Sequence, residues 1–107
     1  MTMTDRDRMI AALLDDAGLS LDEFSRACAV ETEWVVAHVR EGLLPAPGEA
    51  APEAWRFTSL HVRRARAMWR LERDFDAVPE LAALVADLLE EMDTLRGRLR
   101  RAGLDDR

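Results

Sequence analysis

The last third of the sequence contains the pattern that most restricts the fold. Between residues 76 and 103, apolar side chains recur at alternating spacings of four and three, as in helices that pack along a seam. Pro79 suits the first turn of such a helix and Gly103 suits its end. A chain of 107 residues has little core with which to cover so long a face. We therefore expect a homodimer, in preference to intramolecular packing alone, along the seam formed by Leu81, Val85, Leu88, Met92, Leu95 and Leu99.

Two short helices are predicted earlier in the chain. Ser20 and Glu23 have the spacing of a capping box at the start of a helix of about two turns. A second helix is predicted over residues 31–41, with Gly42 as the left-handed residue that ends it. Two short helices joined by a tight turn are typical of a helix-turn-helix motif.

The segment after these helices predicts a small β-hairpin. Residues 45–53 contain too much proline and glycine for a helix or a central strand. Residues 55–57 (WRF) alternate apolar and polar, as in a half-buried strand. Pairing of residues 43–44 with residues 55–57 would give a wing, and a third helix capped by Thr58 or Ser59 follows to about Arg73.

The predicted fold is mainly α. Residues 17–75 form a winged helix-turn-helix domain with a small β-hairpin wing, and residues 76–103 form a long C-terminal dimerisation helix. Residues 1–16 are an N-terminal extension in which residues 9–14 are able to form a short helix.

Charge is distributed unevenly along the chain. Residues 1–54 carry 4 arginines against 11 acids, a net charge of −7, whereas residues 55–107 carry 11 arginines against 10 acids. An acidic half repels phosphate and favours a basic protein partner, although a merely solvated surface accounts for the charge equally well.

The sequence offers little for catalysis or for metal binding. One cysteine excludes an internal disulfide and a CxxC metal pair, and we expect Cys28 to be a buried, inert thiol and not a nucleophile paired with His38. The five glycines are scattered, so no phosphate-binding loop is predicted. We expect a non-enzymatic protein without cofactor or metal. Without a long apolar segment or a signal-peptide core, we also expect it to be cytoplasmic and free of membrane.

The order of these elements resembles the MerR-like family and, more narrowly, the CbpM family, which modulates the DnaJ-type co-chaperone CbpA. The resemblance covers roughly residues 17–101. Residues 1–16 differ from the family pattern, being longer and more helical than the short strand expected there. The segments that carry it are residues 21–24 (LDEF), 33–36 (EWVV), 41–45 (EGLLP), 55–57 (WRF), 63–66 (RRAR) and 71–75 (LERDF), followed by the closing helix.

The resemblance implies a protein that binds the J-domain of its co-chaperone and blocks productive engagement with the DnaK-type chaperone. The J-domain surface used by that chaperone is basic, which suits an acidic modulator. The residues we expect to bind this partner are Glu23, Glu31, Glu33, Trp34, His38 and Glu41. In this hypothesis the glutamates steer and pair with Lys and Arg, and Trp34 is the apolar anchor. Trp34 could instead pack in the core beside Phe24, and the glutamates could simply be solvated.

The alternative is a MerR-like DNA-binding transcriptional regulator. Its phosphate contacts would come from a stripe of arginines on the third helix: Arg63, Arg66, Arg70 and Arg73. We expect this stripe to pair with acids such as Glu72, Glu80 or Glu90 instead. The start of the second helix also carries Glu31 and Glu33 but no arginine, where a DNA-reading helix would meet bases and phosphates, so DNA binding is expected to be weak or absent. A dimerisation or adaptor module with another partner is a third possibility.

Overall fold

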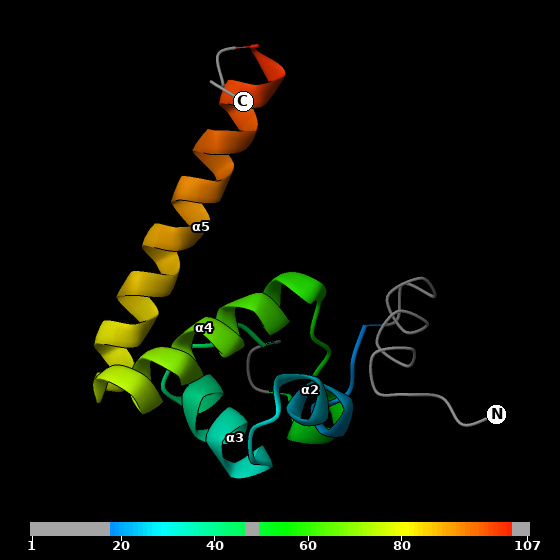
Figure 1. Cartoon of the computed structure of the whole chain (residues 1–107). Coiled ribbons are helices and arrows are strands. Elements are labelled where there is room, and N and C mark those ends of the chain that lie inside the picture. The colour runs from blue at the N-terminus through cyan, green and yellow to red at the C-terminus, as the bar shows by residue number, and fades with distance from the viewer. Residues whose placement is uncertain (1–17, 47–49, 104–107) are drawn as a thin grey trace, which may run out of the picture.

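The computed structural model describes residues 18–46 and 50–103. The expected helix at residues 9–14 and part of the expected wing, residues 47–49, lie outside these ranges. The described elements are four α-helices and one short 3-10 helix (Figure 1). In chain order they are α2 (Leu21–Cys28), α3 (Thr32–Arg40), η1 (Pro52–Ala54), α4 (Ser59–Phe75) and α5 (Pro79–Arg101). The prediction of a mainly α fold is confirmed.

Helices α2 and α3 form the predicted pair. The Ser20 hydroxyl accepts from the Glu23 amide at 3.2 Å, and the Glu23 carboxylate accepts from the Ser20 amide at 2.9 Å, which completes the capping box. Helix α2 ends at Ala29 in the left-handed conformation, at φ 58°. Gly42 follows α3 at φ 76°, as predicted. Three residues between the helices give the tight turn of a helix-turn-helix.

The core lies between α2, α3 and the long helix α4. Phe24 of α2 stacks on Phe57, with ring centroids 4.0 Å apart and planes 8° from parallel. Val35 and Met68 are fully buried beside this pair, together with Leu19. Complete burial of a large apolar side chain stabilises the fold by about 1.5–3 kcal/mol. This core fixes the orientation of α3 on α4.

The predicted pairing of the hairpin is wrong for the described residues. Phe57 exchanges both backbone hydrogen bonds with Leu19, at 2.8 and 2.9 Å, in an isolated antiparallel bridge. The amides of Leu43 and Leu44 instead donate to the carbonyl of His38, which satisfies the C-terminal end of α3. These two residues therefore have no free donors for a ladder. The alternation at residues 55–57 is correct, because Trp55 and Phe57 are buried while Arg56 is exposed.

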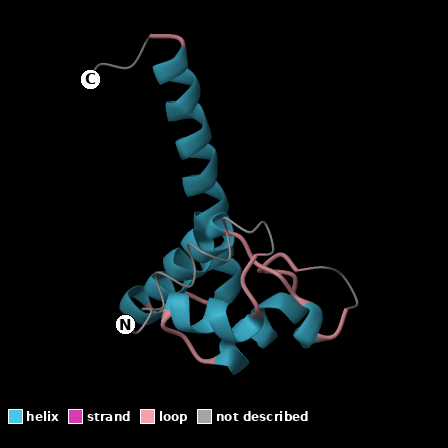
Figure 2. Cartoon of the chain, turned by 90° about the vertical axis from the view of Figure 1, so that its right-hand side faces the viewer, coloured by secondary structure: helices cyan, strands magenta, loops and turns pink. Residues whose placement is uncertain are grey.

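Helix α5 packs on α4 through its first turns and then extends beyond the other helices (Figures 1 and 2). It starts at Pro79 as predicted, and Gly103 follows its end at φ 70°. The face turned toward the rest of the chain consists of small side chains, Ala82, Ala83 and Ala86, all buried. Small residues let two helices approach closely. Among the described residues, no helix is long and apolar enough to cross a membrane.

Candidate functional site

Three glutamates of the predicted partner site lie exposed at the ends of α3. Glu31 is its N-cap residue but makes no side-chain capping bond, Glu33 follows in the first turn, and Glu41 is the C-cap residue. Within the described ranges none of the three forms an ion pair, so their carboxylates remain available to a partner. Glu23 differs, because its carboxylate caps α2 through the Ser20 amide.

Trp34 and His38 face α4 and are tied to it. The Trp34 indole N–H donates to Glu72 Oε1 at 3.1 Å, and His38 Nε2 lies 2.9 Å from Glu72 Oε2. The two rings stack at 3.8 Å, one turn apart on α3, and the edge of Trp34 meets Trp69 at 5.9 Å. His38 is buried and Trp34 is half-buried. We call this set, Trp34, His38, Trp69 and Glu72, the α3–α4 tie.

Each ring nitrogen of His38 has a hydrogen-bonding partner in the tie. The other nitrogen of His38, Nδ1, lies 2.7 Å from the carbonyl oxygen of Trp34. Both oxygens that face the imidazole ring belong to groups that accept hydrogen bonds, so either ring nitrogen has an acceptor within reach when it carries a proton. Glu72 provides the carboxylate that both rings contact, a role that sequence reasoning missed. The one signal available in the sequence was a glutamate at a half-buried position of a helix that is otherwise rich in arginine.

The tie changes the interpretation of two predicted binding residues. The structure brings Trp34 and His38 together, but uses the polar atoms of both within the chain. The alternative that Trp34 packs in the core is supported in part, because Trp34 is half-buried and packs against the core cluster that includes Phe24, although the stacking partner of Phe24 is Phe57. Of the six predicted residues, Glu31, Glu33 and Glu41 are thus the ones whose side chains point to solvent without a described bond.

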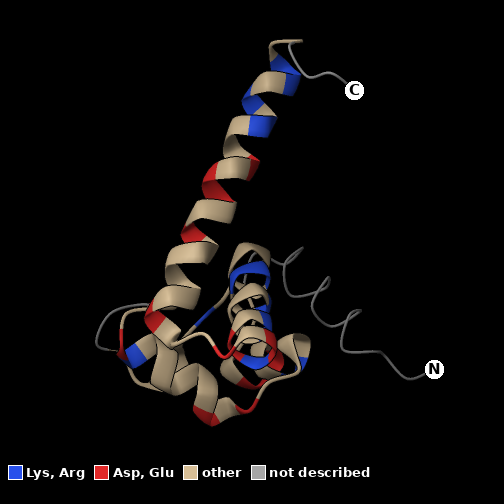
Figure 3. Cartoon of the chain, turned by 60° about the vertical axis from the view of Figure 1, so that its left-hand side comes forward, with Lys and Arg blue, Asp and Glu red and all other residues tan. Residues whose placement is uncertain are grey.

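The arginine stripe of α4 is partly neutralised. Arg63 pairs with Asp93 of α5 at 2.7 Å, and Arg73 pairs with its neighbour Asp74 at 2.9 Å. That hydrogen bond is the main reason why the pKa of Asp74 is lowered. Arg66 and Arg70 are exposed and form no ion pair with another described residue. The expected pairing with acids therefore occurs at two of the four arginines, with acids other than those expected. Basic residues also gather at the far end of α5, beyond the acidic residues of its middle (Figure 3).

The reactive side chains named from the sequence do not form a catalytic arrangement. Cys28 is buried, with its thiol 4.0 Å from the Val62 carbonyl oxygen, and burial raises its pKa to about 12. The prediction that Cys28 is buried is confirmed, and its lack of reactivity stays a prediction. His61 caps α4 through its ring, since Nδ1 accepts from the Thr58 amide at 3.0 Å. Burial lowers the pKa of His61, and Arg64 lowers it further while Glu90 opposes this.

The predicted dimer seam is open to solvent in the single chain. Leu81, Leu88, Met92, Leu95 and Leu99 are 44–56% exposed, and Val85 is half-buried. The alanine face of α5 packs on the body, so the leucine face has no cover among the described residues.

A helix pair joined by a tight turn, followed by a long helix and a projecting one, is the arrangement of a helix-turn-helix fold. A family model described as MerR HTH family regulatory protein matches residues 19–102, and the chain belongs to this family. This confirms the resemblance described above.

Curated relatives narrow the comparison further. The chain is similar to the chaperone modulatory protein CbpM of Coxiella burnetii strain Dugway 5J108-111 and of strain RSA 331 / Henzerling II. Each is 29% identical over 82 residues, which cover 77% of this chain and 76% of the relative. The chain is thus CbpM-like, and neither the family nor these relatives is described as an enzyme. No solved structure matches the chain.

Proposed function

We propose that the protein is a non-enzymatic inhibitor of a DnaJ/CbpA-type co-chaperone. It binds the J-domain and competes with the DnaK-type chaperone for it, in the cytoplasm and without a cofactor. The observation that carries this proposal is the similarity to proteins named chaperone modulatory protein CbpM, which extends over three quarters of both chains. The family model, which matches residues 19–102, includes the whole of α2, α3 and α4.

The charge on α3 supports this proposal. Glu31, Glu33 and Glu41 are exposed on one short helix and have no described ion pair that would have to break on binding. The J-domain surface that meets the DnaK-type chaperone is basic in the family that the chain resembles. Opposite charges on two surfaces raise the association rate and fix their orientation, more than they raise affinity. The glutamates are therefore expected to steer the encounter.

The test is a calorimetric titration of the full chain with an isolated J-domain of a DnaJ-type co-chaperone. Saturable binding is expected, and the double variant Glu31→Lys/Glu33→Lys should bind at least fivefold more weakly at low salt. The matched control, Glu80→Lys/Glu91→Lys, makes the same change in charge on α5 and should stay within twofold of the wild type. Absence of binding by the wild type would refute the proposal, and equal binding by the two double variants would refute steering by α3.

Competition needs a separate measurement. If the two proteins share one J-domain surface, adding this protein should reduce the ATPase stimulation that the J-domain gives to a DnaK-type chaperone. Excess chaperone should restore the stimulation. An inhibition that excess chaperone does not relieve would contradict competition.

We also propose that α5 forms a homodimer through its leucine face. The six seam residues present a continuous apolar stripe along a helix that leaves the body, and burial of such a stripe stabilises a helix pair. Sedimentation of the wild type should show a dimer that Leu88→Gln/Leu95→Gln converts to a monomer. A wild-type monomer at concentrations of about 100 μM would contradict this.

The alternative of a DNA-binding regulator rests on the family and on two exposed arginines. Arg66 and Arg70 lie one turn apart on α4 and have no described ion pair, so they are able to contact phosphates. Binding to duplex DNA through such contacts would weaken steeply between about 50 and 200 mM salt. Detectable binding with that dependence, lost in Arg66→Ala/Arg70→Ala, would favour this alternative.

A further inference from the structure

A groove of about 850 Å³ lies where α4, α5 and the segment after α3 meet. Leu60 of α4 and Leu89 of α5 line it, together with Leu43 and Pro45 from the segment that follows α3. Leu60 is 66% exposed and Leu89 is 44% exposed. Leu89 lies one turn from Val85 and Met92 and so borders the predicted dimer seam, whereas Leu60 belongs to a different helix. None of the six seam residues lines the groove, which is therefore distinct from the seam although it borders it.

The rim of the groove is acidic toward solvent. Asp87, Glu90 and Asp93 of α5 line it, and the side chain of each is about half exposed although it is ion-paired. Two arginines face them, but Arg64 is only 11% exposed and points its charge inward. Arg63 is thus the one guanidinium of this set that water reaches freely. Three carboxylates against two arginines leave the rim with a net charge of −1, and water reaches all three carboxylates but only one of the guanidiniums, which favours a basic ligand.

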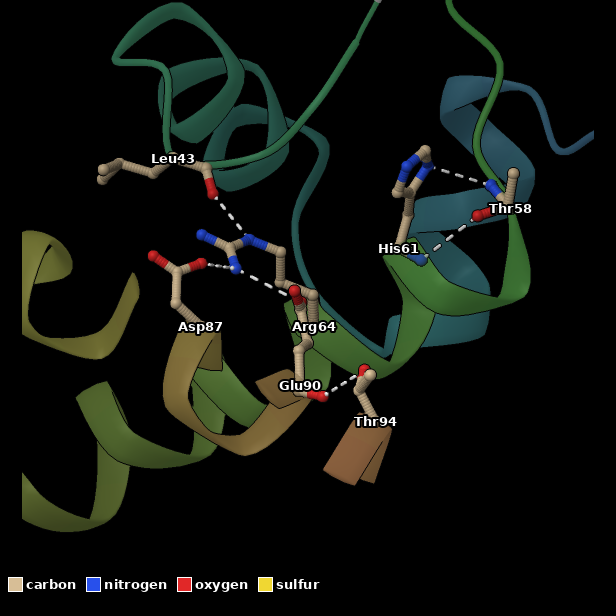
Figure 4. A network of polar contacts seen from close by, with 7 residues as sticks. All are labelled: Leu43, Thr58, His61, Arg64, Asp87, Glu90 and Thr94. Carbon is tan, nitrogen blue, oxygen red and sulfur yellow. Dashed lines mark hydrogen bonds and ion pairs between the residues drawn. The ribbon is translucent and has the colours of Figure 1, made fainter. Parts of the chain in front are cut away.

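Arg64 joins the walls of the groove (Figure 4). Its Nε donates to the Leu43 carbonyl oxygen at 3.0 Å, and its Nη1 donates to Asp87 at 2.6 Å and to Glu90 at 3.2 Å. One side chain on α4 therefore connects the segment after α3 with α5. A surface that is already shaped loses less conformational entropy when it binds.

The position of the groove links it to the acidic surface of α3. Glu41 is exposed at the C-terminal end of α3, and the next residue, Gly42, lines the groove. The α3–α4 tie uses the polar atoms of Trp34 and His38 within the chain. The groove adjoins the Glu41 end of the acidic surface and offers an apolar contact there.

We infer that this groove is the apolar anchor site for the partner, and that its occupant is a basic amphipathic segment of the J-domain. An apolar side chain of that segment packs between Leu60 and Leu89, and flanking Lys or Arg side chains meet the carboxylates of the rim. The inference rests on the proposed function and assigns it a docking site. It replaces Trp34 as the anchor.

The test compares two neutral double variants in the same titration with an isolated J-domain. Leu60→Gln/Leu89→Gln removes the apolar walls without changing charge and should raise Kd at least tenfold. The matched control, Phe75→Gln/Val78→Gln, replaces two apolar residues outside the groove that are somewhat more exposed than the groove pair, and should stay within twofold of the wild type. Leu60→Gln alone, on α4, leaves α5 intact and should raise Kd about threefold.

The outcomes separate the two proposals. Weaker binding by the groove variants than by the control supports the inference. If circular dichroism shows that the double variant is unfolded, the single variant Leu60→Gln provides the test instead. If the wild type binds, and Leu60→Gln and the folded double variant bind equally well, the groove is not the docking site. The proposed function would remain in place. Failure of the wild type to bind would overturn the proposed function, and the groove assignment with it.

Discussion

Replacement of Glu72 is the sharpest test of how α3 is attached. Glu72→Ala removes both acceptors of the α3–α4 tie and leaves the Trp34 indole N–H and His38 Nε2 without partners. The side chain of His38 is 7% exposed, so water does not replace its lost contact freely. An unsatisfied buried polar group costs about 1–3 kcal/mol. Because Trp34 is half-buried and partly reached by water, the sum expected for Glu72→Ala is about 2–3 kcal/mol.

Glu72→Gln gives the matched comparison. Its amide oxygen still accepts from the Trp34 indole, and its amide N–H donates to His38 Nε2 if the neutral ring keeps its proton on Nδ1 for the Trp34 carbonyl. All three hydrogen bonds survive in this arrangement. We therefore expect Glu72→Gln to cost less than about 1 kcal/mol, since only the charge is lost.

Urea unfolding followed by tryptophan fluorescence and circular dichroism, at one fixed protein concentration, measures these differences. Arg70→Ala, an exposed change on the same helix, should stay within about 0.5 kcal/mol of the wild type. A loss of 2–3 kcal/mol corresponds to a fall in Tm of roughly 8–20 °C for a domain of this size. Equal losses in Glu72→Ala and Glu72→Gln would refute the hydrogen-bond accounting, and no loss in Glu72→Ala would refute the tie itself.

Three further predictions concern individual residues. The lowered pKa of His61 means that its contribution to stability is complete above its ordinary value of 6.5 and is lost as pH falls through the lowered value. The drop in unfolding free energy between about pH 7 and pH 5 should therefore be smaller in His61→Gln, which keeps the capping bond to Thr58; an unchanged drop would contradict this. Cys28, with a pKa of about 12, should resist a thiol reagent at pH 8 in native protein and react fully in urea, and rapid native labelling would contradict its burial. Ala29→Gly should raise the unfolding free energy by about 0.5–1 kcal/mol, because glycine has no steric cost at φ 58°. A lower unfolding free energy in urea would show that alanine is unstrained in this conformation.

Sequence patterns fixed by nearby residues predicted the helices well. The capping box at Ser20, the glycine that follows α3 and the proline that opens α5 each depend on contacts within four residues of one another. Such local chemistry is legible in a single sequence. The heptad pattern likewise marked the face of α5 that the body leaves uncovered.

Long-range pairings were less accessible. The bridge joins Phe57 to Leu19, 38 residues earlier. The apolar pair at residues 43–44 lies closer in the sequence, and no pattern in the sequence favoured Leu19 over it as the partner. In the same way, Glu72 lies 38 residues from Trp34, and its partner could be found only once α3 and α4 were placed together. The groove also depends on the crossing of two helices. Its apolar members are ordinary leucines in the sequence.

Because α5 packs on the body through alanines near its start, small shifts there produce larger displacements at its far end. Its fulcrum, from Ala82 to Ala86, is about 6 Å long, while Arg101 lies fifteen residues farther along, at about 22 Å. A displacement of about 1 Å across the fulcrum tilts the helix by roughly 10° and moves the far end by about 4 Å. One added methyl group at Ala83 would thus be magnified at the arginine-rich tip. The direction of the far end is thus set by three methyl groups near the base of α5, together with the ion pairs that join Asp87, Glu90 and Asp93 to α4.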